Sequence, residues 1–158
     1  MRVFRLCERR HSKSVLSDEG GLHFDGRWHS QGRRIVYCAS CEALAVLEVR
    51  VHVGRFMRRT PFTMHEIELP DEAVETLSRR ELPKQWHRVS PSKRAQELGD
   101  AWLERNKALA LAVPSIHSHS DRNILINPAH EAAGRIKVVA RRPYEFDPRL
   151  FGKALRAR

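Results

Sequence analysis

The chain has 158 residues, of which 41% are hydrophobic, and a formal net charge of +10 at pH 7. This length and composition suit one globular domain with its own core, and they exclude a wholly disordered chain. The apolar runs at 43–47 and 108–113 are too short to span a bilayer, and the first ten residues hold no apolar signal-peptide core. We therefore expect a cytoplasmic protein without a membrane contact, and three reduced cysteines.

Hydrophobic periodicity predicts a mixture of strands and helices. Runs typical of strands lie at 1–6, 35–37, 61–69, 109–113, 124–126 and 136–140. One helix is expected over 41–52, capped by Ser40, and a second after Ser90 with Pro91 in its first turn. A long polar connection covers 7–34, and such a connection is usually functional. The succession favours an α+β fold in a single compact domain over 1–158, with the motif-bearing part at about 1–140.

The remainder, 141–158, is a basic C-terminal tail. From Gly134 onward the chain has eight Lys or Arg residues and two acidic ones. A basic surface suits nucleic acid, a polyanionic small molecule or an acidic protein, and a solvated, solubilising tail is equally compatible with it. A basic nucleic-acid-binding module is therefore one alternative. Against it, the aromatic fraction is only 7%, and neither an RNP-like nor a helix-turn-helix motif is present.

Glu48 is the most informative residue of the expected helix. On helical spacing it shares a face with three apolar residues, Leu44, Leu47 and Val51. A charge on an apolar face costs several kcal/mol unless a partner or a ligand compensates it. The sequence leaves both explanations open: a core arginine that pairs with Glu48, or a ligand.

The spacing of the glycines excludes two common nucleotide-binding motifs. Gly26 and Gly32 bracket Arg27, but they form neither G-x-G-x-x-G nor G-x-x-x-x-G-K-[ST]. Phosphates would instead have to be bound by side-chain guanidinium groups, such as those of Arg5 and Arg27.

A metal-dependent hydrolase is a second alternative. Its ligands would be His117, His119 and Asp121, which share one face if the segment is a strand. The segment is rich in Ser and follows Pro114-Ser115, so a polar loop is favoured, and a single C-x-x-C at 38–41 adds little. We expect no metal site.

Arg27, Tyr37 and Glu48 together suit the cleavage of an N-glycosidic bond. Positive charge builds on the ribose as the bond breaks, and a carboxylate stabilises it. A tyrosine ring can stack on the departing base, and an arginine fork can hold a pyrophosphate. Ser115 and Asn123 add a hydroxyl and an amide near the ends of two expected strands.

Taken in order, these segments resemble the RES domain, a family named for an Arg, a Glu and a Ser. Seven motifs of the family pattern have counterparts here, from the first strand to about Val138. They are Asp25-Gly26-Arg27-Trp28-His29, Ile35-Val36-Tyr37, Ala43-Leu44-Ala45-Val46-Leu47-Glu48, Leu82-Pro83-Lys84-Gln85-Trp86, Gly99-Asp100-Ala101-Trp102-Leu103, Val113-Pro114-Ser115 and the N-x-L-I-N-P-x-H run at 123–130.

The resemblance implies a toxin of a bacterial toxin–antitoxin pair, with a fold similar to the ADP-ribosylating toxins. It implies consumption of NAD, as a substrate and not as a cofactor, by cleavage of the nicotinamide–ribose bond. The acceptor stays open between water, phosphate and a protein side chain. Arg27, Tyr37, Glu48 and Ser115 would be the catalytic group, and Arg5, Arg27, Tyr37 and Asn123 would contact NAD.

The partner implied by the resemblance is a helix-turn-helix antitoxin, with DNA contacted only through that antitoxin. A homodimer and a protein acceptor of ADP-ribose stay open. The chain departs from the family pattern at two places: His29 stands where the family has Asn, and Ser120-Asp121 replaces a Glu.

Overall fold

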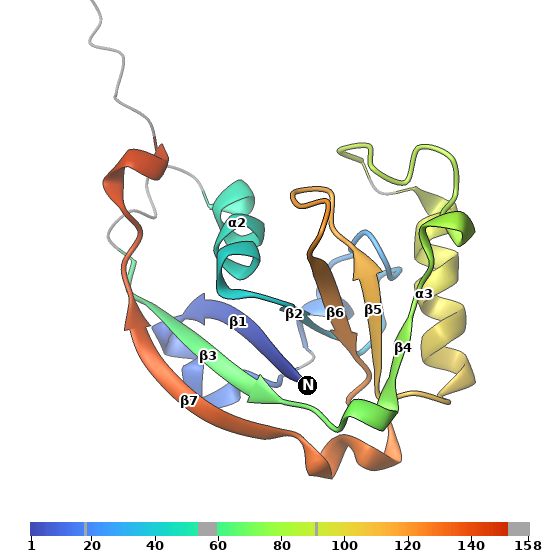
Figure 1. Cartoon of the computed structure of the whole chain (residues 1–158), viewed down its shortest axis with the longest axis horizontal. Coiled ribbons are helices and arrows are strands. Elements are labelled where there is room, and N and C mark those ends of the chain that lie inside the picture. Colours follow the sequence, from blue (N-terminus) through green and yellow to red (C-terminus); the bar gives the residue numbers. More distant parts are fainter. Residues whose placement is uncertain (18, 54–59, 91, 152–158) are drawn as a thin grey trace, which may run out of the picture.

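The computed structural model describes residues 1–17, 19–53, 60–90 and 92–151. Within them a seven-stranded sheet runs in the order β4-β5-β6-β2-β1-β3-β7 (Figure 1). The strands are β1 (Arg2–Glu8), β2 (Val36–Ala39), β3 (Phe62–Glu68), β4 (Val74–Thr76), β5 (Ala110–Pro114), β6 (Arg122–Ile126) and β7 (Lys137–Tyr144). Neighbours pair antiparallel except β4 and β5, which are parallel. The expected α+β class is confirmed.

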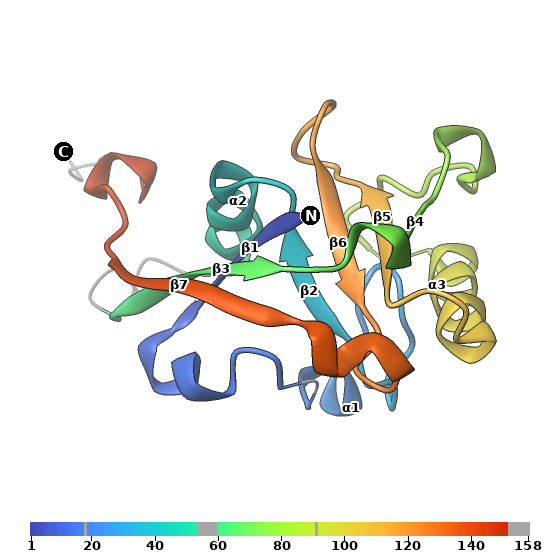
Figure 2. The same cartoon turned by 60° about the horizontal axis from the view of Figure 1, so that its bottom comes forward.

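Two helices cover separate halves of one sheet face. The helix α2 (Glu42–His52) packs on β1 and β2, and α3 (Lys93–Arg105) packs near β5 and β6, so the two stand well apart in both views (Figures 1 and 2). Leu6 and Leu44 belong to the core under α2, whereas Trp102 and Leu125 belong to the core under α3. The middle of this face, around β2 and β6, is left for other side chains.

The opposite face of the sheet is covered by short helical segments and loops. Its core includes Val3, Cys38 and Ile124 from the strands. The covering elements are η1 (Arg9–Ser14), η3 (Asp71–Ala73) and η5 (Glu131–Arg135), with the residues that follow η1. The short helix α1 (Gly20–His23) instead brings Gly21 close to Ile35 and His29. The remaining short helices are η4 (Arg79–Glu81) and η6 (Pro148–Phe151). No helix in the described part of the chain is long and apolar enough to cross a bilayer.

The start of α2 differs from the expectation. Its N-cap is Cys41, whose Sγ accepts the Leu44 N–H at 3.5 Å, and not Ser40. The Ser40 hydroxyl is used by the neighbouring strand instead, because it accepts the backbone N–H of Arg122 at 3.0 Å. The cap therefore moves one residue along the chain.

The apolar face expected for α2 is also wrong. Leu44 and Ala45 are the buried residues of the helix, whereas Leu47 and Val51 are 39% and 52% exposed. Helical periodicity identifies a set of aligned residues, but the neighbouring sheet decides which set is covered. Glu48 consequently lies at the border of the buried face, where a carboxylate is partly solvated.

The expected basic tail contains regular structure. β7 continues past Ala140, because Arg141 and Arg142 pair with His65 and Met64 of β3. Farther on, Phe151 joins the core under α2, where the guanidinium of Arg50 lies 4.4 Å from its ring centroid. Residues 152–158 lie outside the described residues, as does Pro91, and α3 begins at Lys93.

Gly99 allows α3 to contact the loop that carries Trp28. A Cβ at Gly99 would lie 1.7 Å from the Trp28 carbonyl oxygen, which is rigid backbone. We expect Gly99→Ala to lower the free energy of unfolding by about 1–3 kcal/mol, the range for overpacking. Gly134→Ala is the matched control, because nothing lies within 4 Å of its added Cβ. Equal urea midpoints for the two variants would contradict the close contact.

Candidate active site

Glu48 is held by side chains from two strands of the sheet. Its Oε1 accepts a hydrogen bond from Ser115 Oγ at 3.1 Å and one from Asn123 Nδ2 at 2.7 Å. Ser115 follows the last residue of β5 and is 4% exposed, while Asn123 lies in β6. The Glu48 side chain is 29% exposed, and its Oε2 lies 3.8 Å from Nε2 of His117. Glu48 is therefore an accessible carboxylate with one oxygen fixed, and not the partner of a core arginine.

Tyr37 is fixed by a chain of hydrogen bonds. Its hydroxyl accepts the Trp28 N–H at 3.4 Å and lies 2.7 Å from His29 Nδ1. His29 Nε2 faces the Phe24 carbonyl oxygen at 3.1 Å, so Nε2 carries the hydrogen and Nδ1 accepts the phenol proton. Burial raises the pKa of Tyr37 well above its ordinary value, and the phenol stays protonated.

Gly26 is required at this point of the loop. An added Cβ would lie 2.6 Å from His29 Nδ1 and 2.9 Å from the Tyr37 hydroxyl. Only glycine lets the backbone approach the hydrogen-bonded pair this closely. The motif glycine thus serves side-chain packing and not a phosphate loop.

Arg27 connects the site to the loop that follows η4. Its Nη1 donates to the carbonyl oxygens of Trp86 and Arg88, at 2.6 and 2.7 Å. Burial lowers the pKa of Arg27, and the negative charge of Glu48 opposes this shift. Glu48 and Tyr37 therefore lie within electrostatic range of a partly desolvated guanidinium.

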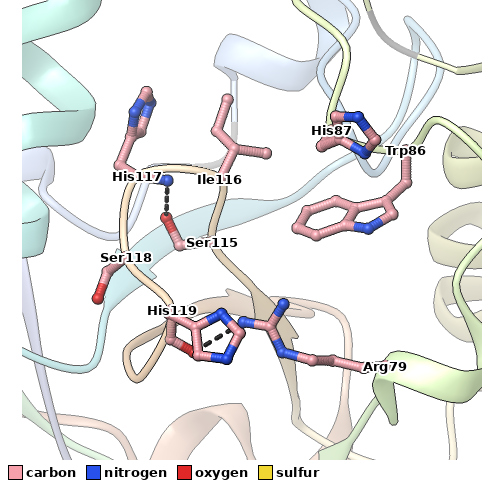
Figure 3. A pocket seen from close by; sticks show the side chains of 8 residues that line it. All are labelled: Arg79, Trp86, His87, Ser115, Ile116, His117, Ser118 and His119. Atoms are coloured by element: carbon pink, nitrogen blue, oxygen red, sulfur yellow. Dashed lines mark hydrogen bonds between the residues drawn. The ribbon is translucent and has the colours of Figure 1, made fainter.

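A pocket of about 340 Å³ is lined by Ser115 and His117, the two residues of the loop after β5 that face the Glu48 carboxylate. Figure 3 shows its two walls, formed by the loop after β5 on one side and by η4 with the following loop on the other. Arg79 joins the walls, because its Nη2 donates to the His119 carbonyl oxygen at 2.7 Å. The lining residues are Arg79, Trp86, His87, Ser115, Ile116, His117, Ser118 and His119.

The structure brings together five of the six predicted site residues, Arg27, Tyr37, Glu48, Ser115 and Asn123. Arg5 is placed differently. In β1 it shares a face with Val3 and Cys7, which pack in the core on the far side of the sheet. Its Nη1 donates to the Tyr37 carbonyl oxygen at 3.2 Å, so Arg5 holds the backbone of β2 from the sheet face opposite to Glu48.

Two of the contacts differ from the roles first expected. Ser115 and Asn123 hold the Glu48 carboxylate, whereas the resemblance placed Ser115 in the catalytic group and Asn123 in contact with NAD. His29 supports Tyr37, a role for which the sequence offered only its place beside Arg27 in the loop. Arg79 and His87 were not predicted, because no pattern links them to the other motifs.

The residues considered for a metal do not converge. In 1–17, 19–53, 60–90 and 92–151, no three His, Cys, Asp or Glu side chains form a group that could hold a metal ion. Asp121 accepts a hydrogen bond from Ser118 Oγ at 2.5 Å, and His117 faces Glu48. In the described part of the chain, His117, His119 and Asp121, the ligands considered for a metal-dependent hydrolase, therefore do not form one cluster.

Comparison with known proteins places the chain in a family. It matches the RES domain over residues 2–147. The protein named Toxin Res of Photorhabdus laumondii is 35% identical over 151 residues, which are 95% of this chain and 97% of that protein. The Prs ADP-ribosylating toxin of Sphingobium sp. is 35% identical over 149 residues, 92% of each chain.

The solved structure of the M. tuberculosis MbcT–MbcA toxin–antitoxin complex contains the same fold. Its matching chain aligns with a TM-score of 0.76 at 17% identity, over 91% of this chain and 84% of that one. The α+β fold of this chain is thus also the fold of a chain in a toxin–antitoxin complex. The chain belongs to the RES domain family, the family of these toxins.

The buried histidine beside Tyr37 makes stability depend on pH. Burial lowers the pKa of His29 below its ordinary value near 6.5. Below about pH 6.5 the unfolded chain binds a proton that the folded chain resists, so the free energy of unfolding falls as the pH drops toward 5. His65, whose pKa is also lowered by burial, acts in the same direction.

We expect His29→Asn to reduce this pH dependence, because Asn does not titrate in the range. The measurement is urea unfolding of the wild type and the variant at pH 8, 7, 6 and 5. An identical decrease in both proteins would contradict the assignment to His29.

Proposed function

We propose that this toxin consumes NAD by cleaving the bond between nicotinamide and ribose. The observation that carries the proposal is the Glu48 carboxylate, partly exposed beside an open polar pocket and fixed through one oxygen by Ser115 and Asn123. A carboxylate fixed in this way is oriented before a substrate arrives. Such preorganisation is the main source of electrostatic catalysis.

The departure of nicotinamide needs no general acid. When the N-glycosidic bond of NAD breaks, its electron pair neutralises the pyridinium nitrogen, and nicotinamide leaves without being protonated. Positive charge develops on the ribose, and the nearby carboxylate of Glu48 stabilises it. NAD is the substrate, and the reaction needs no further cofactor.

Arg27 and Tyr37 are proposed to bind and orient NAD. Nη1 of Arg27 serves two backbone carbonyls, so a phosphate or a ribose hydroxyl would be met by its Nε and Nη2 groups. The neutral Tyr37 ring, fixed through its hydroxyl, offers a face for the nicotinamide end. Water, inorganic phosphate and a protein side chain all remain acceptors compatible with this scheme.

The relatives support a toxin that acts on NAD. One of them carries the name Prs ADP-ribosylating toxin, and ADP-ribose is transferred from NAD. The solved neighbour is a toxin bound to its antitoxin. We propose an antitoxin partner for this chain as well, a cytoplasmic helix-turn-helix protein that covers the NAD pocket. The net charge of +10 on this chain favours an acidic surface on that antitoxin.

The alternative of a basic nucleic-acid-binding module gains little support. Three of the C-terminal arginines are engaged within the protein: Arg135 pairs with Glu72, Arg142 with Glu42 and Arg149 with Asp147. These pairs reduce the free positive charge that would contact phosphates.

Glu48→Gln is expected to abolish the release of nicotinamide from NAD, by at least about 100-fold in kcat. The amide oxygen can still accept the hydrogen bonds from Ser115 and Asn123, so circular dichroism should be unchanged. Glu42→Gln, on the same helix but paired with Arg142, is the matched control and should retain activity. Full turnover by a folded Glu48→Gln protein would disprove the proposed mechanism.

Arg27→Ala is expected to weaken NAD binding by about 1.5–3 kcal/mol, the range for a charged hydrogen bond. Calorimetry in the Glu48→Gln background measures this affinity without turnover. Arg33→Ala provides the control, because Arg33 pairs with Glu104 on α3. Unchanged affinity in Arg27→Ala would remove Arg27 from the NAD site.

Expression of the wild type should arrest the growth of a bacterial host and lower its NAD content before growth stops. Expression of Glu48→Gln to the same soluble level should leave both unchanged, because the carboxylate is lost. Cellular NAD and optical density are measured together. Growth arrest with constant NAD would point to a different target.

A further inference from the structure

The second carboxylate oxygen of Glu48 faces an imidazole that has no role in the scheme above. Oε2 of Glu48 lies 3.8 Å from Nε2 of His117, and the two side chains are 29% and 23% exposed. This separation is too long for a direct hydrogen bond. A polar pair at such a distance is commonly bridged by a water molecule or a hydroxyl group.

His117 is held by the same serine that holds Glu48. The backbone N–H of His117 donates to Ser115 Oγ at 3.0 Å, and that hydroxyl in turn donates to Glu48 Oε1 at 3.1 Å. One hydroxyl therefore sets the position of both groups. The bond uses the backbone of His117, so it survives a change of its side chain.

The rest of the loop is restrained as well. Arg79 donates to the carbonyl oxygen of His119 at 2.7 Å, and Ser118 Oγ donates to Asp121 at 2.5 Å. In Figure 3 the His117 ring extends away from Arg79 and His119. It reaches α2 at Glu48, on the side of the loop where the carboxylate lies.

An oxygen atom fits between the two groups. A hydroxyl oxygen about 2.8 Å from both Nε2 and Oε2 closes a triangle whose third side is the 3.8 Å separation. Such an oxygen would give one hydrogen to the imidazole and, if it is water, the other to the carboxylate. It would also lie beside the ribose that Glu48 stabilises.

We propose that His117 accepts the proton of the attacking hydroxyl group. The acceptor of ADP-ribose is then a neutral compound with an O–H group, in the simplest case water. This inference rests on the proposed cleavage of NAD. The O–H bond breaks and its proton passes to His117 Nε2, the oxygen bonds to C1′ of the ribose, and the C1′–N bond breaks with its electron pair going to nicotinamide. The products are ADP-ribose, nicotinamide and one proton, which His117 releases to solvent.

The charges around His117 determine what a pH profile reports. Glu48 of α2 faces it directly, and Arg79 of η4, His87 of the following loop and His119 of its own loop line the same pocket. Arg79 keeps its charge throughout the pH range of the experiment, so a decline of the rate on the acid side has to be assigned among Glu48 and the histidines. Substitution of His117 alone separates them.

The test compares the wild type with His117→Gln, His117→Ala and a control, His11→Gln, in η1 away from the pocket. Nicotinamide release is measured from pH 5 to 9, with and without sodium azide, and products are identified by mass. We expect kcat to fall about 10²–10⁴-fold in both His117 variants, with KM little changed, and the acidic decline of kcat to disappear. His11→Gln should match the wild type.

Azide distinguishes proton transfer from a structural role. It attacks C1′ as an anion and releases no proton, so it should restore turnover in His117→Ala and give ADP-ribosyl azide. Wild-type kcat in the His117 variants, or a loss that azide does not restore, would overturn the inference while leaving NAD cleavage intact. A wild type that releases no nicotinamide would overturn the proposed function itself.

Discussion

The site depends on a single carboxylate oxygen that is hydrogen-bonded from two neighbouring strands. Oε1 of Glu48 receives Ser115 from the end of β5 and Asn123 from β6. The β5–β6 ladder sets the distance between these donors, because Val113 and Asn123 are paired in it. A slip of one residue would turn Asn123 to the other face of the sheet and leave the carboxylate with half its support. Strand register is thus a condition for the chemistry.

Much of the fold could be predicted from the apolar runs, and the ordered motifs named five residues that the structure brings together around Glu48. Two features could not. In β1 the alternation Val3-Phe4-Arg5-Leu6 is apolar on both faces, so it does not tell on which side Arg5 lies. The three-residue strand β4 is too short to give a periodic signal, and it is defined only by its parallel pairing with β5.

The partners of Glu48 show a second limit of sequence reasoning. Helical spacing aligned Glu48 with Leu47 and Val51, but the sheet covers Leu44 and Ala45 instead. The Glu48 carboxylate was expected to be buried, but it lies at the edge of the buried face and is hydrogen-bonded there. Its desolvation free energy is therefore far smaller than that of a buried, unpaired charge. His29 shows the reverse case. The sequence marked it only as a departure from the family pattern, but in the structure it is 4% exposed and its ring lies against the Tyr37 hydroxyl.

The outer strand β7 has a consequence for the behaviour of the protein in a crowded cell. It closes one border of the sheet and exposes most of its residues, among them Lys137, Arg141 and Pro143. Like-charged side chains and a residue without an N–H discourage another polypeptide from extending the ladder. The opposite border is β4, only three residues long. Both borders therefore disfavour strand-to-strand pairing between copies of the chain, the contact from which fibril-like stacking grows.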